Sequence, residues 1–276
     1  MTLLYDPLQI FVASTTPAGL YARQKWLKEQ HRPEWQTDYD STVALLQSGQ
    51  LANGSWRHSV SMTVKQLFGL HLTIRHPTPQ INNALDWLLT QVKRQLDSDD
   101  GHRRESVQRQ MTEQLPFMAG RRDGFVLAAT LFLASIFGRE NHPQILTLFQ
   151  MLNKDAEQGQ AYWKDLTCFN NILRAFVVHP RYATKSAVRT AVRRLKALQT
   201  TAGDWGHQLP FYKIVNALAH LDLPQAENQL QRAFRYLAKS QKPDGTWGTD
   251  QPEWNTFLVV HALKNKNILS MRAMTF

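Results

Sequence analysis

A short pattern, Gln-x3-Gly-x-Trp, recurs along the chain and limits the folds that it can adopt. It occurs at 50–56, 199–205 and 241–247, and the last two copies begin 42 residues apart. A segment with helical spacing of apolar residues precedes and follows each copy. A period of this length corresponds to one helix pair per repeat. The repeat therefore predicts an all-α chain built from successive helix pairs.

The residue types of the repeat indicate how it joins helices. Glycine permits a backbone with positive φ, which other residues rarely adopt. Tryptophan can cover the ends of two neighbouring helices, and the glutamine amide can satisfy backbone groups that a helix terminus leaves unpaired. We therefore expect each repeat to form a turn that ties two helix pairs together.

The stretch between Trp56 and Trp205 has room for roughly three more helix pairs. Amphipathic segments occur there at 81–96 and 183–198, while 125–137 is apolar all round. We expect about a dozen helices and no strand, with apolar helices in an inner ring and amphipathic helices in an outer ring. The segment 99–123 breaks this pattern. It is a candidate lid over a cavity, but its polar composition favours a mobile loop with partial helix.

Composition narrows the class of protein and its compartment. The chain has 276 residues, 43% of them hydrophobic, and a formal charge of +10. A lone cysteine, Cys168, excludes an internal disulfide framework and fits a reducing compartment. The N-terminus lacks the pattern of a secretory signal, and the 13-residue apolar run is too short to cross a bilayer. We expect a single domain over 1–276, located in the cytoplasm or at the periphery of a membrane.

The repeat between paired helices resembles the QW repeat of squalene/hopene cyclases and other terpenoid cyclases. It is also similar to the cognate repeat of protein prenyltransferase beta subunits. The resemblance covers the chain from Asp38 to Leu269 and implies an α/α toroid of about six helix pairs around a cavity. It further implies an isoprenoid or other lipidic ligand in that cavity. A non-catalytic toroid that binds a protein or lipid is the alternative function, and a glycan-active toroid is the third.

The terpenoid cyclases start their reaction with the central acid of an Asp-x-Asp-Asp motif. This chain has such a motif at 97–100, so the resemblance makes Asp97, Asp99 and Asp100 candidate catalytic residues. Crowded carboxylates keep one of their number protonated and acidic. The motif here follows an outer-helix pattern, whereas in the family it opens an inner helix. A solvated loop is therefore the alternative interpretation.

Protein prenyltransferases hold zinc through an Asp and a Cys on one inner helix and a His on another. Asp165 and Cys168 open an inner-helix pattern here, but with the spacing Asp-x2-Cys where the family has Asp-x-Cys. Asn255 occupies the position expected for the histidine, and His261 lies about two turns further along. Because four-coordinate sites tolerate little displacement, we expect no zinc and a structural role for Cys168.

Aromatic residues at helical spacing predict the wall of a ligand site. Trp254 and Phe257, for example, share one face of a helix. Such rings can enclose an apolar chain or stabilise a cation, with core packing as the alternative for each ring. The candidate ligand-binding residues are Phe169, Phe176, Tyr212, Trp254, Phe257, Asp165 and Cys168.

Positive charge is concentrated in one part of the chain. The stretch 166–203 has no acidic residue, and its basic residues are Arg174, Arg181, Lys185, Arg189, Arg193, Arg194 and Lys196. Within 181–196 they recur at helical spacing and predict a basic outer face. A solubility face is one interpretation. An anionic membrane surface or an acidic protein is the expected partner otherwise, and nucleic acid is the least favoured because aromatic residues do not interleave with the cations.

Overall fold

The computed structural model describes residues 3–97, 106–159 and 161–269. Within them the chain forms twelve α-helices, and its strands are the two-residue β1 (Ser106–Val107) and β2 (Gly120–Arg121), which pair antiparallel. The all-α class expected from the repeat is confirmed. The expectation of no strand was wrong only for this short pair. None of the described helices has the length and apolar character needed to cross a membrane.

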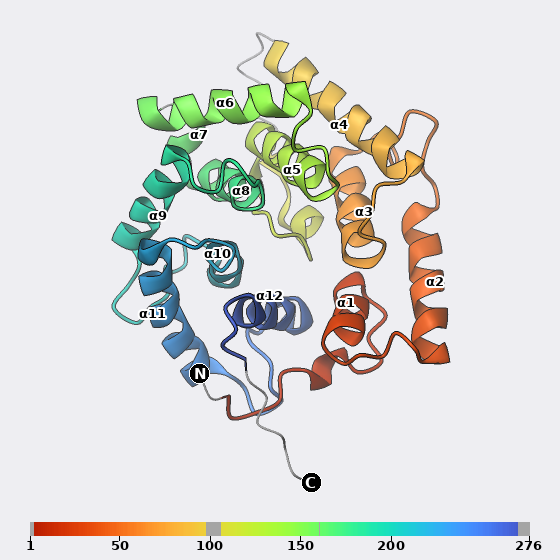
Figure 1. Cartoon of the computed structure of the whole chain (residues 1–276), viewed down its shortest axis with the longest axis vertical. Coiled ribbons are helices and arrows are strands. Elements are labelled where there is room, and N and C mark those ends of the chain that lie inside the picture. Colours follow the sequence, from red (N-terminus) through yellow and green to blue (C-terminus); the bar gives the residue numbers. More distant parts are fainter. Residues whose placement is uncertain (1–2, 98–105, 160, 270–276) are drawn as a thin grey trace.

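The helices form two concentric layers (Figure 1). The inner layer consists of α1 (Pro17–Lys25), α3 (Val60–Thr73), α5 (Arg122–Ile136), α8 (Leu166–Val177), α10 (Phe211–Leu218) and α12 (Pro252–Asn265). Each of these helices contacts the next, and α12 contacts α1, so the inner layer closes into a ring. The outer layer consists of α2 (Pro33–Gln47), α4 (Pro79–Asp97), α6 (Pro143–Gln158), α9 (Ser186–Leu198) and α11 (Pro224–Ser240). The short α7 (Ala161–Lys164) packs against α6 and α8.

The two layers follow from two kinds of apolar pattern. Inner α5 buries an unbroken run of residues, 124–135, because it has helices on every side. Outer α9 buries a single stripe, which consists of Ala187, Val188, Ala191, Val192 and Leu195. A helix with apolar residues all round requires neighbours all round, whereas a stripe requires only one packed face.

The glutamine of each repeat fastens its turn to the next outer segment. Gln50 Nε2 donates to Gly54 O within the turn and to Gln80 O at the start of α4, both at 2.9 Å. The other two repeats make the same pair of bonds, from Gln199 to Gly203 and Gln229 and from Gln241 to Gly245 and Tyr5. Each glutamine therefore ties its own turn to a backbone carbonyl of the neighbouring outer segment.

The tryptophan and glycine of each repeat also have fixed roles. Trp205 Nε1 donates to Leu195 O at 2.9 Å, and the indoles of Trp56 and Trp247 bond the preceding helix end in the same way. Gly54 has φ 88°, and a Cβ there would lie 2.3 Å from the carbonyl oxygen of Asn83. Only glycine allows both this backbone conformation and this close approach.

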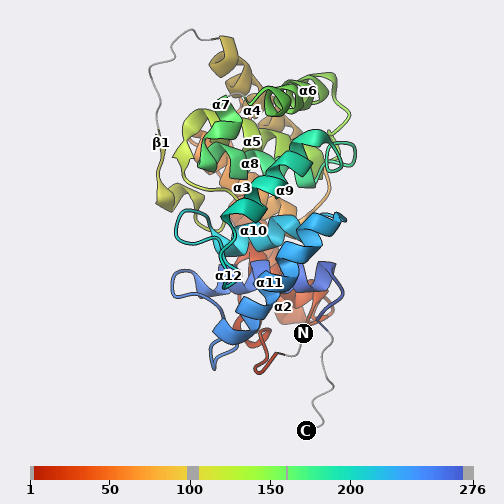
Figure 2. The same ribbon diagram turned by 90° about the vertical axis from the view of Figure 1, so that its left-hand side faces the viewer.

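The segment between α4 and α5 enters the ring from one end. Figure 2 shows β1 on the side of the ring where the loops before α10 and α12 lie, and Arg109 pairs with Asp250 of the latter loop at 2.7 Å. Phe117 is fully buried against Phe132, with ring centroids 5.4 Å apart. The partial helix expected within 99–123 is present as η2 (Arg109–Thr112), and the described part, 106–123, also packs Phe117 into the core, which the sequence pattern did not predict. Residues 98–105 lie outside the described residues.

We call residues 115–118 the plug. Hydrogen bonds from distant side chains fix its backbone. Met118 N donates to Asn171 Oδ1 at 2.7 Å, and Asn171 Nδ2 donates back to Met118 O at 3.1 Å. Lys213 Nζ donates to Phe117 O. The sequence pattern failed here because a few apolar residues in a polar segment, with side-chain partners from distant helices, are enough to order it.

Candidate functional site

A cavity of about 270 Å³ lies inside the ring. All six inner helices, or the residues directly after them, contribute to its wall, and Pro116 of the plug completes it. Its polar and aromatic lining residues are Tyr21, Phe68, His71, Arg75, Phe132, Arg174, Asn216, His220, Trp254, Phe257 and His261. Leu72, Ile136, Val178 and Leu258 are the aliphatic ones. This is the central cavity that a ring of helices makes available for a ligand.

The cavity is closed at one end. Pro116, Phe68 and Trp254 are buried, and they lie toward the end that the plug fills. Ile136 and Val178, at the C-terminal ends of α5 and α8, are only half-buried. The cavity therefore opens where the inner helices end, and the ends where these helices begin are filled by the plug.

Aromatic rings make up the closed part of the wall. Trp254 and Phe257 are stacked, with centroids 5.3 Å apart and an interplanar angle of 11°. Phe68 meets Trp254 edge to face at 5.8 Å, and Tyr21 meets Phe257 in the same way at 5.4 Å. These offset-stacked and edge-to-face arrangements fix the rings as a rigid apolar surface.

Two guanidinium groups line the same cavity and have no acidic partner among the described residues. Arg174 is 7% exposed, its Cζ lies 5.2 Å from the centre of the Phe132 ring, and its Nε and Nη1 have no hydrogen-bond partner. Arg75 lies over the Tyr21 ring at 4.2 Å, and its Nε and Nη2 are also buried without a partner. Burial lowers the pKa of Arg174 to about 9 and also lowers the pKa of Arg75. Both groups are charged at neutral pH. The lowered pKa of Arg174 is still above 7, and an arginine side chain stays protonated in proteins.

Three histidines complete the polar part of the wall. Burial, followed by repulsion from Arg75 and Arg174, lowers the pKa of His71 to about 3. The same causes lower the pKa of His261 to about 4, and burial puts the pKa of His220 well below its usual value. All three imidazoles are therefore neutral at pH 7. Positive charge in the cavity comes from the two arginines, and the lining residues in the described part of the chain include no Asp or Glu.

The structure brings two of the predicted aromatic residues into the cavity, namely Trp254 and Phe257. Phe169 and Phe176 instead face Trp163, at 6.2 and 5.7 Å, between α8 and the outer layer. Tyr212 lies in the first turn of α10, outside the cavity wall. The spacing of these rings placed them on common helix faces correctly, but it could not show which face of an inner helix looks inward.

Asp165 and Cys168 act locally at the start of α8. Asp165 caps the helix, because its Oδ1 accepts a hydrogen bond from Cys168 N at 2.8 Å. Cys168 is fully buried next to Gly124, where a Cβ would lie 2.3 Å from Sγ. Burial first, and then the Asp165 charge, raise the pKa of the thiol to about 12. Across the described residues, no three His, Cys, Asp or Glu side chains come together as a metal site.

The carboxylate motif lies elsewhere. Asp97 is the last residue of α4, is exposed, and borders a groove of about 710 Å³ between α4 and α6 on the outside of the ring. Asp99 and Asp100 lie outside the described residues. The one member of the motif that the structure places therefore faces away from the central cavity.

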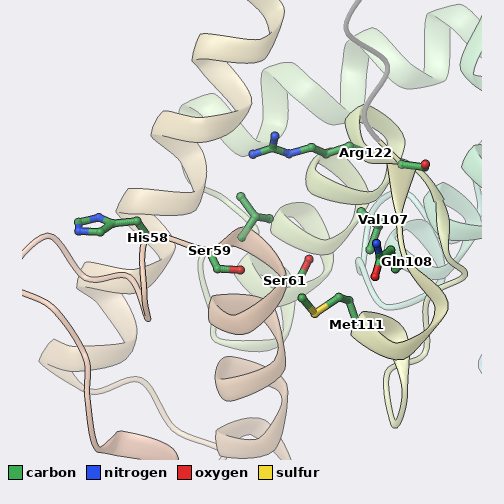
Figure 3. Close-up of a pocket in the computed structure, with 9 residues that line it drawn as sticks. His58, Ser59, Ser61, Val107, Gln108, Met111 and Arg122 are labelled. Carbon is green, nitrogen blue, oxygen red and sulfur yellow. The ribbon is translucent and has the colours of Figure 1, made fainter.

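A second pocket, of about 310 Å³, lies between the start of α3 and the segment β1 to η2 (Arg109–Thr112) (Figure 3). Ser59 and Ser61 point toward it, whereas the His58 ring points away from both hydroxyls. His58 Nδ1 lies 3.1 Å from Asn53 Nδ2, and the Ser59 side chain caps α3. This pocket therefore has no paired nucleophile and base.

Sequence reasoning missed most of the polar residues of the cavity. Arg174 was named only as one of the cations of the acid-free stretch 166–203, whereas the structure places it on an inner helix and among the residues that line the cavity. Its position between Leu173 and Ala175 in an otherwise apolar helix was the available signal. His71 and His220 carried no signal, because a lone histidine at a helix end is common on any surface.

Comparison with known proteins supports the fold. A crystal structure of a protein from Actinoplanes has a TM-score of 0.55 and 17% sequence identity, over 92% of this chain and 89% of that chain. No family model and no curated protein matches the sequence. Since one fold can host many functions, function has to be argued from the cavity.

Proposed function

We propose that this protein binds a small hydrocarbon-rich ligand, of isoprenoid or other lipidic type, in its central cavity. The observation that carries this proposal is the aromatic wall formed by Phe68, Phe132, Trp254 and Phe257 around one end of the cavity. An apolar, concave and pre-formed surface with few polar groups is the usual form of a small-molecule site.

The volume of the cavity favours a short ligand. At about 270 Å³ it lies just below the range of about 300–1,000 Å³ that is typical of ligand pockets. A compact or short-chain lipid fits this space better than a polycyclic product. The similarity of the Gln-x3-Gly-x-Trp repeats to those of terpenoid cyclases and prenyltransferase beta subunits supports the same ligand class.

Binding, rather than cyclisation, is the function that the cavity favours. Protonation of an alkene or epoxide needs an acid at the ligand, and the described lining residues include no carboxyl group. The buried Cys168 thiol, with its raised pKa, is also a poor nucleophile. We therefore propose that the protein is a lipid-binding ring of helices whose repeats resemble those of terpenoid cyclases and prenyltransferase beta subunits.

The test uses two uncharged alcohols, geraniol and decanol, and two matched tryptophan variants. Ile136→Trp places a large ring at the open end of the cavity, whereas Leu198→Trp places one on the outside, at the end of α9. We expect wild type and Leu198→Trp to bind the alcohols in calorimetric titrations, and Ile136→Trp to bind them at least tenfold more weakly. Equal binding by both variants, or no binding by wild type, would contradict the proposal.

A second candidate function is supported by the outer surface. Lys185, Arg189, Arg193 and Lys196 are all exposed on α9, and exposed Arg235 and Lys239 lie on the neighbouring α11. These six cations fit an anionic membrane surface or an acidic protein. Sedimentation with phosphatidylserine vesicles at low salt, reversed at high salt, is the expected result; binding that ignores salt would count against it.

A further inference from the structure

We propose that the ligand of the central cavity carries an oxyanion, a carboxylate or a phosphate group, which Arg75 and Arg174 bind. This inference rests on the proposed function for the hydrocarbon part of the ligand and adds the chemistry of its head group. It also predicts how the ligand is oriented in the cavity. The head group lies near the two arginines, and the apolar body lies against the aromatic wall.

Arg174 is the first observation. Its side chain lines the cavity, the residue is more than nine-tenths buried, and two of its three nitrogens, Nε and Nη1, are buried without any hydrogen-bond partner. A buried charge without a partner is among the most costly arrangements in a folded protein, so its presence requires a compensating contact. A carboxylate or phosphate supplies that contact, because its oxygens match the fork of N–H groups on a guanidinium.

Arg75 is the second observation, and it comes from another helix. It follows α3, stacks on Tyr21, and leaves Nε and Nη2 buried without a partner. Its backbone has φ 65°, a left-handed conformation that costs energy in a residue other than glycine. This left-handed residue lies just after the end of α3, as Asn267 lies just after the end of α12, and its side chain is among those that line the cavity.

The remaining polar atoms of the wall have the same character. Trp254 Nε1, His71 Nδ1 and His220 Nε2 are buried and have no hydrogen-bond partner. An indole nitrogen can only donate, and a neutral imidazole can present one N–H group. Among the described lining residues, the atoms without partners thus belong to one indole that can only donate, two imidazoles that can donate or accept, and two cationic guanidiniums. The two positive charges suit an oxyanion and disfavour a cation, including a carbocation intermediate.

The positions of these groups orient the ligand. Arg75 lies over the Tyr21 ring, whose centroid is 5.9 Å from that of His261. Arg174 lies over the Phe132 ring, whose centroid is 6.4 Å from that of His71. Arg75 and His220 are half-buried and lie at the open end, whereas Phe68, Trp254 and Pro116 are buried toward the plug. The hydrocarbon part therefore enters first, and the oxyanion remains near the opening.

The experiment compares three ligands that share one chain: decanol, decanoate and decyl phosphate, with inorganic phosphate as a fourth probe. We expect wild type to bind decanoate or decyl phosphate about tenfold more tightly than decanol, the difference that a charge-assisted contact gives. Arg174→Gln should abolish that preference, so that decanoate and decyl phosphate bind it no more tightly than decanol does. The matched control is Arg189→Gln, an exposed cation on α9, which should retain the preference. Arg75→Gln is the second cavity variant and keeps the test usable should Arg174→Gln fold poorly.

The outcomes separate this inference from the proposed function. Equal affinity of wild type for all three ligands, or a preference that survives both arginine variants, would overturn the oxyanion site and leave lipid binding intact. Thermal stabilisation by inorganic phosphate that is lost in Arg174→Gln, without binding of any decyl compound, would support the oxyanion site for a free phosphate and overturn lipid binding. No response to any of the four probes would overturn both.

Discussion

Gln241, in the turn after α11, donates a hydrogen bond from Nε2 to the carbonyl oxygen of Tyr5, 2.9 Å away. The glutamines of the two earlier repeats make the equivalent bond to the outer helix that follows them. Here the segment before α1 takes the place of that helix, and the bond joins residues that are 236 positions apart. Gly245 of the same turn lies against this segment as well, since a Cβ there would be 2.2 Å from Asp6 O. The third repeat therefore closes the outer layer, as α12 and α1 close the inner one.

The first prediction concerns this closure. Gly245→Ala should destabilise the protein strongly, because it combines a left-handed backbone (φ 82°) with a clash against a backbone oxygen. Gly206→Ala is the matched control: its φ is 63°, but nothing lies within 4 Å of the new Cβ. We expect a loss of about 1–2 kcal/mol for Gly206→Ala and a clearly larger one for Gly245→Ala in urea unfolding. Equal losses would show that close packing on Asp6 contributes nothing.

The second prediction compares two buried arginines. Arg174 has no acidic partner, so Arg174→Met should leave the free energy of unfolding unchanged or raise it by about 1–3 kcal/mol while removing the preference for anions. Arg23 is equally buried but pairs with Glu29 at 2.8 Å and Asp38 at 2.6 Å. Arg23→Met should therefore destabilise the protein by up to about 3–5 kcal/mol, since it removes the near partner of the buried Glu29 carboxylate, which keeps only the 3.5 Å contact with exposed Arg32 among the described residues. Unfolding curves of both variants measure this, and a large loss for Arg174→Met would mean that its charge has a partner within the protein.

The fold was more accessible from the sequence than the site was. The repeats were found because glutamine, glycine and tryptophan each make a bond or a turn that few other residues can make. The sequence pattern did not predict one further tryptophan of this kind. Trp163 Nε1 donates to Leu152 O at 2.9 Å, as Trp205 Nε1 does to Leu195 O. No matching Gln-x3-Gly precedes Trp163, so the pattern alone could not reveal it.

The cavity depended on information that periodicity does not contain. An inner helix is buried on all sides, so spacing alone cannot separate the face toward the cavity from the face toward the outer layer. Phe176 and Trp254 illustrate this, because both belong to apolar inner helices, yet only Trp254 lines the cavity. Likewise, the charge count could not separate buried Arg174 from the exposed cations that follow it, because net charge does not report burial.

The third prediction concerns acid. The histidines of the cavity have folded-state pKa values below those of the unfolded chain, so the unfolded state binds more protons and stability falls as pH decreases. For His71 and His261 the window runs from about 6.5, the unfolded value, down to about 3 and 4. Each can contribute up to about 1.4 kcal/mol per pH unit within its window. The free energy of unfolding, measured between pH 7 and 4, should therefore fall less steeply in His71→Gln than in wild type.

Two comparisons sharpen the test of acid sensitivity. His207→Gln, at an exposed position, carries the same substitution outside the cavity and serves as the control. Decyl phosphate, which keeps at least one negative charge between pH 7 and 4, should reduce the pH dependence of wild type, because it offsets the repulsion from Arg75 and Arg174 that adds to burial in lowering the pKa of His71 and His261. An unchanged slope in His71→Gln would assign the acid sensitivity to other groups.

The last prediction concerns the plug that closes the cavity. Asn171→Ala removes both hydrogen bonds to Met118, one donated by the amide and one accepted by it. Each bond contributes about 0.5–1.5 kcal/mol, so residues 115–118 should open more often while the helix ring stays folded. Hydrogen exchange at Met118 should then accelerate at least fivefold, and exchange in α9 should stay unchanged. Asn153→Ala, on the outer α6, is the matched control. If Asn171→Ala accelerates exchange throughout the molecule, the plug is not a separate unit but an integral part of the core, and ligands enter only through the end where the inner helices terminate.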